Sequence, residues 1–135
     1  MKELTVEASI DNLDRVTDFI NAELEAADCP MKAQMQIDVA IDELFSNIAY
    51  YAYAPETGAV TIRMELEEAP RAARITFIDR GKPYDPLSVQ DPDITLSAED
   101  RKVGGLGIFL VKKTMSEVHY AYEDGCNMLT IRKEL

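Results

Sequence analysis

The alternation of apolar and polar positions predicts a chain of five strands and three helices. A two-residue alternation, which is typical of strands, marks residues 3–8, 59–67, 73–79, 117–123 and 127–133. Apolar positions at helical spacing predict helices over 12–27 and 31–54, and a glycine-rich turn opens a third over 105–116. Because the strands come in hairpins and do not alternate strictly with helices, we expect an α+β fold. Its mixed, mostly antiparallel sheet is covered on one face by helices, as a two-layer sandwich.

A loop of about two dozen residues, 80–103, interrupts this pattern. Loops of that length without regular structure are usually functional lids or mobile segments. The chain of 135 residues shows no repeat and no linker between compositionally different parts. We therefore predict one domain over residues 1–135.

The charge of the chain narrows the classes of partner. Fourteen basic and 25 acidic side chains give a net charge of −11, which disfavours non-specific binding to nucleic acid or to an anionic membrane. We expect a basic partner, or an anion held by backbone amides. No run approaches about 18 apolar residues, and the two distant cysteines indicate free thiols, so we expect a cytoplasmic protein.

The second predicted helix carries the first candidate group of site residues. Glu43 and Asn47 are four residues apart, so both project from one face, beside the apolar stripe that contains Leu44 and Ile48. A carboxylate and a carboxamide at such an edge supply oxygen ligands for Mg²⁺ and a general base. A solvated polar face with a local contact between Glu43 and Asn47 is the alternative.

Two further groups follow along the chain. Asp79 ends a strand, where a carboxylate can accept a hydrogen bond from an exocyclic amine such as that of adenine, and Gly81 would let backbone approach a flat ring. Gly104, Gly105, Leu106 and Gly107 precede a helix, where backbone amides bind phosphates, and Lys102 adds positive charge nearby. The alternatives are an ordinary strand-to-turn segment and a flexible turn that caps a helix.

The order of these features resembles the GHKL, or Bergerat-fold, ATP-binding superfamily. Within it, the chain is similar to the anti-sigma-factor serine kinases of the RsbW and SpoIIAB type over nearly its whole length. By this resemblance DELFSNIAYYAY is the N-box, Glu43 is the catalytic base and Asn47 binds Mg²⁺. Asp79 and Gly81 match the first glycine box, which reads the adenine amino group. Gly104 to Gly107 match the second box, which lies against the phosphates.

The resemblance implies an ATP- and Mg²⁺-dependent protein serine/threonine kinase. Such a protein sequesters a sigma factor, phosphorylates an anti-anti-sigma protein with a STAS domain, and forms a homodimer, and Arg15 falls where the family places a partner-contacting arginine. The chain departs from the family pattern at Tyr51, where His or another polar residue is frequent, and at Lys82-Pro83, where the second glycine of the first box is missing. A module that binds ATP or ADP as a switch and regulates by sequestration therefore stays open, as does a scaffold that binds no nucleotide.

Overall fold

The computed structural model describes residues 1–88 and 106–135. The elements, with short non-α helical turns labelled η, are β1 (Lys2–Glu7), η1 (Ile10–Asn12), α1 (Leu13–Ala26), α2 (Met31–Asn47), η2 (Ile48–Ala52), β2 (Ala59–Glu68), β3 (Arg71–Asp79), η3 (Pro86–Ser88), α3 (Leu106–Thr114), β4 (Glu117–Glu123) and β5 (Cys126–Glu134). All eight predicted elements are present, and every bound except the end of the second helix lies within a few residues of the predicted one.

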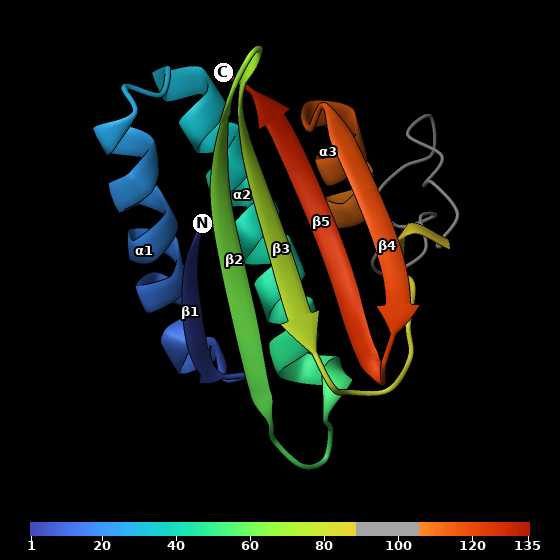
Figure 1. The fold of residues 1–135 in the computed structure, drawn as a ribbon. Helices are drawn as coiled ribbons and strands as arrows, with labels where there is room; N and C mark the ends of the chain where they lie inside the picture. The colour runs from blue at the N-terminus through green and yellow to red at the C-terminus, as the bar shows by residue number, and fades with distance from the viewer. Residues whose placement is uncertain (89–105) are drawn as a thin grey trace.

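The five strands form one sheet in the order β1-β2-β3-β5-β4. All four strand pairs are antiparallel, so within the described residues the expected mixed sheet is an antiparallel one. Figure 1 shows α1, α2 and α3 on the same face of this sheet. The predicted α+β class and its two layers are confirmed.

The core lies between the sheet and the helices, because each element turns its apolar positions to the same interface. The helices bury Val16, Ile20, Ile37, Ile41, Leu44 and Val111, and the strands bury Val60, Ile62, Ile75, Phe77 and Ile131. On β2 and β3 these positions alternate with more accessible ones such as Thr61, Arg63 and Ile78, which lie on the uncovered face. The alternation that predicted the strands therefore also identifies the open face of the sheet.

The main departure from the predicted elements lies at the end of the second helix. The α-helical pattern stops at Asn47, and Ile48–Ala52 form a single π-helical turn. Periodicity predicts one helix over 31–54, because five π-helical residues shift the apolar stripe too little to show in the sequence. The π turn brings Ala52 within hydrogen-bonding distance of Lys82, which follows β3.

A half-buried carboxylate, that of Asp38 on α2, is hydrogen-bonded to Asn21 on α1. Burial raises the pKa of Asp38 above its ordinary value, a hydrogen bond with the Asn21 side chain opposes this shift, and the Glu25 charge adds to it. One oxygen of each side chain, Oδ1 of Asp38 and Oδ1 of Asn21, is buried without a hydrogen-bond partner in the described structure. The ionised form of Asp38 is therefore less favourable in the folded chain than in the unfolded one.

We predict that Asp38→Asn raises the melting temperature more at pH 7 than at pH 4. A carboxyl whose pKa is raised on folding lowers the free energy of unfolding as the pH rises from its ordinary pKa, 3.8, through the raised value. Asn does not ionise, so Asp38→Asn removes this pH-dependent loss of stability. Thermal melts of the wild-type chain and of Asp38→Asn at pH 4 and pH 7 measure the difference in melting temperature at each pH. Asp18→Asn, which removes an exposed charge from α1, controls for the lower net charge. An equal gain at both pH values would contradict the prediction.

Candidate functional site

The N-box pair is in contact on one face of α2. Nδ2 of Asn47 donates a hydrogen bond to Oε1 of Glu43 over 3.2 Å, and both side chains are half-buried. This bond uses the amide nitrogen of Asn47. Its carbonyl oxygen, Oδ1, accepts no hydrogen bond from the described residues and is available to a cation. The pair therefore fits Mg²⁺, which prefers few protein oxygen ligands and completes its shell with water and phosphates.

The first turn of α3 lies directly against this pair. At Gly107 a Cβ atom would overlap the carboxylate of Glu43, so a larger residue fits here only if the end of the Glu43 side chain moves away. The first four backbone amides of a helix have no partner within it, and they favour anions. The fold thus brings Glu43, Asn47 and Gly107 together, with the amide end of α3 beside the carboxylate.

Asp79 lies at the end of β3 and is nearly buried, with 5% of its surface exposed. Its Oδ1 accepts hydrogen bonds from the backbone nitrogen of Gly81, at 2.8 Å, and from Nδ2 of Asn127, at 3.0 Å. Both bonds that the described residues make to this carboxylate end on Oδ1. Among the described residues, none donates to the second oxygen, Oδ2, which can accept a hydrogen bond from a ligand.

The turn after Asp79 packs against the end of the π-helical segment. A Cβ atom at Gly81 would overlap the carbonyl of Ala52, so this position requires glycine for close backbone approach. Lys82 donates twice to this region, from its backbone nitrogen to O of Ala52 and from Nζ to O of Ala54, each over 2.9 Å. Pro83 stands where the family has a second glycine, and Lys82 before it caps the carbonyl end of the helical segment.

Asn127 is a member of the site that sequence reasoning missed. It is nearly buried on β5, and its Nδ2 also donates to O of Lys82 over 2.9 Å, while its Oδ1 accepts from the backbone nitrogen of Tyr84 over 3.1 Å. Tyr120 donates its hydroxyl to the same Oδ1. The available signal was its position, since 127 alternates with Leu129 and Ile131 and so predicts an amide facing the core.

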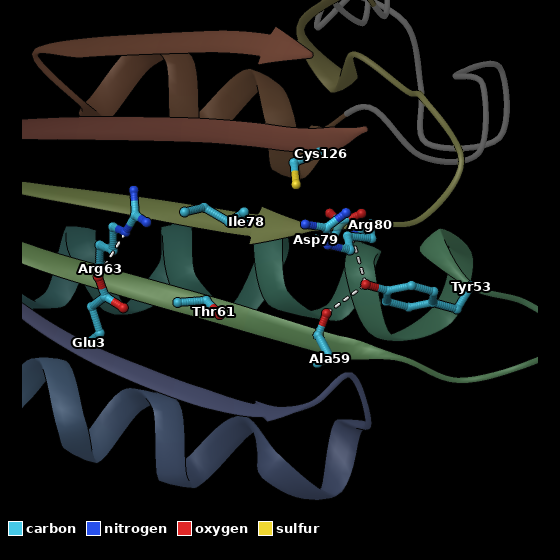
Figure 2. Close-up of a pocket in the computed structure, with 9 residues that line it drawn as sticks. All are labelled: Glu3, Tyr53, Ala59, Thr61, Arg63, Ile78, Asp79, Arg80 and Cys126. Carbon is cyan, nitrogen blue, oxygen red and sulfur yellow. Dashed lines mark hydrogen bonds and ion pairs between the residues drawn. The ribbon is translucent and has the colours of Figure 1, made fainter. Parts of the chain in front are cut away.

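A pocket of about 450 Å³ lies beside this turn, on the sheet face that the helices leave open. Its lining residues are Glu3, Tyr53, Ala59, Thr61, Arg63, Ile78, Asp79, Arg80 and Cys126. Figure 2 shows them along the strands, with α2 behind the sheet. The pocket includes neither Glu43 nor Asn47, so it is distinct from the pair on α2.

The chain matches the family model of the histidine kinase-like ATPase domain over residues 6–133. The chain belongs to this family. The predicted resemblance to GHKL proteins and their anti-sigma serine kinases is thereby confirmed, because the curated relatives of this ATPase domain carry kinase names.

One relative is the serine/threonine-protein kinase BtrW of Bordetella bronchiseptica, 29% identical over 100 residues, which cover 74% of this chain and 70% of BtrW. The serine-protein kinase RsbW of Listeria monocytogenes is 26% identical over 98 residues, 69% of this chain and 61% of that protein. The match thus spans less than two thirds of RsbW. The crystal structure of the RsbU and RsbW domains of Rv1364c from Mycobacterium tuberculosis shares the fold, with a TM-score of 0.64 and 17% identity, over all of this chain and 33% of that one.

The structure describes two of the remaining predicted site residues, and three lie outside the described ranges. Arg15 is exposed on α1, and Leu106 is the first residue of α3. Lys102, Gly104 and Gly105 lie outside the described residues. Within the described ranges, no three acidic, His or Cys side chains gather around a common point, and no helix has the length and apolarity to cross a membrane.

Proposed function

We propose that this chain is an ATP-dependent protein serine/threonine kinase and an anti-sigma regulatory factor. It would phosphorylate an anti-anti-sigma protein with a STAS domain and sequester a sigma factor. The observation that carries this proposal is the Glu43 carboxylate, which is hydrogen-bonded to Asn47 and packed against the first turn of α3. Family membership and kinase-named relatives support it.

In the proposed reaction the chain positions the reactants and compensates charge, which is most of what phosphoryl transfer requires. Glu43 would accept the proton of the substrate hydroxyl as the oxygen attacks the terminal phosphate of ATP. The backbone amides at the start of α3, Gly107 among them, would hold the phosphate oxygens, with Gly104, Gly105, Leu106 and Lys102 completing this end. Oδ1 of Asn47 would hold Mg²⁺, which when bound neutralises phosphate charge.

Recognition of the base is assigned to the turn after β3. Oδ2 of Asp79 would accept a hydrogen bond from the amino group of adenine, while Gly81 N and Asn127 Nδ2 hold Oδ1. A carboxylate that is nearly buried and already oriented loses little freedom when it binds. The phosphates would thus bind near Glu43 and the adenine near Ala52. These two residues are the ends of the segment that joins the last part of α2 to η2.

The proposed partners dock on the same domain, which we take to span residues 1–135. A net charge of −11 suits a basic sigma factor, and exposed Arg15 on α1 is proposed as a contact to a protein partner. We also propose a homodimer, which the resemblance implies, and a cytoplasmic location, with no direct contact to nucleic acid or membrane.

A phosphorylation assay tests the proposal. The purified chain is incubated with Mg²⁺ and radiolabelled ATP, together with each STAS-domain protein encoded in the same genome. We expect label on a Ser or Thr of one of them, dependent on Mg²⁺. Nucleotide binding without transfer to any of them would contradict the kinase and favour a switch that regulates by sequestration. Absence of binding by calorimetry would favour a scaffold.

A further inference from the structure

The hydroxyl of Tyr53 joins two parts of the candidate site. It donates a hydrogen bond to O of Ala59 over 2.6 Å and accepts one from the backbone nitrogen of Arg80 over 2.7 Å, as Figure 2 shows. Tyr53 follows η2, which continues the helix of Glu43 and Asn47, and Arg80 directly follows Asp79. One side chain therefore links the helix of the N-box to the turn that carries Asp79.

The tyrosine ring is itself held in place. A Cβ atom at Gly58 would overlap the ring of Tyr53, so the ring packs directly on the backbone that leads into β2. Burial raises the pKa of the Tyr53 phenol, and the hydroxyl keeps the proton that it donates to Ala59. The position of this hydroxyl is thus fixed by packing, independently of its bond to Arg80.

The bond to Arg80 acts on the peptide unit next to the proposed adenine ligand. The nitrogen of Arg80 belongs to the peptide that begins at the carbonyl carbon of Asp79, so a fixed nitrogen restricts the rotation that would swing the Asp79 side chain. Asn127 holds Oδ1 of Asp79 from the side of β5, and the backbone nitrogen of Lys82, three residues after Asp79, donates to O of Ala52. Tyr53 is the contact that restrains the backbone at Asp79 itself from the side of the helix.

We propose that Tyr53 is a positioning residue that sets the base selectivity of Asp79. Its hydroxyl holds the peptide between Asp79 and Arg80 so that Oδ2 of Asp79 meets the amino group of adenine. This inference rests on the proposed function, because it assumes that Asp79 reads the base. It adds a residue outside both predicted glycine boxes to the determinants of specificity.

The test compares two nucleotides on the full chain and on Tyr53→Phe, which keeps the ring on Gly58 and removes both hydrogen bonds. Isothermal titration calorimetry gives the Kd of ATP and of inosine triphosphate, which lacks the amino group and presents a carbonyl oxygen to Asp79. We expect the wild-type chain to prefer ATP, so that the Kd of inosine triphosphate divided by the Kd of ATP exceeds one. Tyr53→Phe is expected to lower this ratio by about three- to tenfold. A loss of folded protein alone would leave that ratio unchanged, because it affects both titrations equally.

Tyr51→Phe is the matched control, because Tyr51 is 69% exposed and lies two residues away. Its ratio is expected to equal that of the wild-type chain. If the wild-type chain prefers ATP and Tyr53→Phe retains the full preference, the role of Tyr53 is overturned while the proposed function stands. If the wild-type chain binds both nucleotides equally, the adenine role of Asp79 fails, and the inference fails with it.

Discussion

Replacing Glu43 by Gln is expected to slow phosphoryl transfer by about 10²–10⁴-fold, because a general base contributes roughly that factor. Gln retains an oxygen that can accept the hydrogen bond from Asn47, so the helix face and the position of Asn47 are preserved. Nucleotide affinity should change little, since Asp79 and the start of α3 are untouched. The rate is measured in single-turnover phosphorylation of the STAS substrate, and the affinity by calorimetry.

Asp42→Asn provides a matched control for this experiment. Asp42 is the preceding residue of α2, and it is exposed. Its replacement removes the same charge from the same helix without touching Asn47 or Gly107, and the rate is expected to stay within about twofold of wild type, as for a screened surface charge. Full activity of Glu43→Gln would show that Glu43 is not the base. A Kd for ATP that rises as much as the rate falls would instead make it a binding residue.

The features that the sequence predicted share a physical origin in local periodicity. Alternation along β2 and β3 follows from one buried and one open face, so Ile62 and Phe77 could be assigned to the core without a structure. The contact between Glu43 and Asn47 follows equally from helical spacing, because residues four apart lie on one face. These predictions needed no knowledge of which elements would become neighbours.

The features that were missed depend on contacts between distant segments. Asn127 holds Asp79 across 48 positions of sequence, and Tyr53 reaches Arg80 across 27. No local pattern predicts that either side chain would face the turn after β3, because the π-helical segment and the pairing of β3 with β5 set their positions. Gly107 was predicted as part of a phosphate site, whereas its contact with the Glu43 carboxylate depends on the packing of α2 against α3.

That contact makes Gly107→Ala the second variant with a large expected effect. The added methyl group would occupy the position of the Glu43 carboxylate, and the flexible end of Glu43 can move away at a modest cost of about 1 kcal/mol in folding stability. The displaced base is expected to lower the rate of phosphoryl transfer by about a hundredfold, because a misplacement of about 1 Å in a reacting group can have an effect of that order. The variant should therefore remain folded and inactive.

Combining Gly107→Ala with Glu43→Ala separates the two effects. Once the Glu43 side chain is truncated, the methyl group at 107 meets no carboxylate, and Gly→Ala within a helix should then stabilise the fold by about 0.5–1 kcal/mol. The sign of the stability change is thus expected to reverse between the two backgrounds, as measured by urea unfolding. A change of equal sign and size in both would show that the carboxylate of Glu43 does not occupy the space beside Gly107, and the placement of the base against α3 would be wrong.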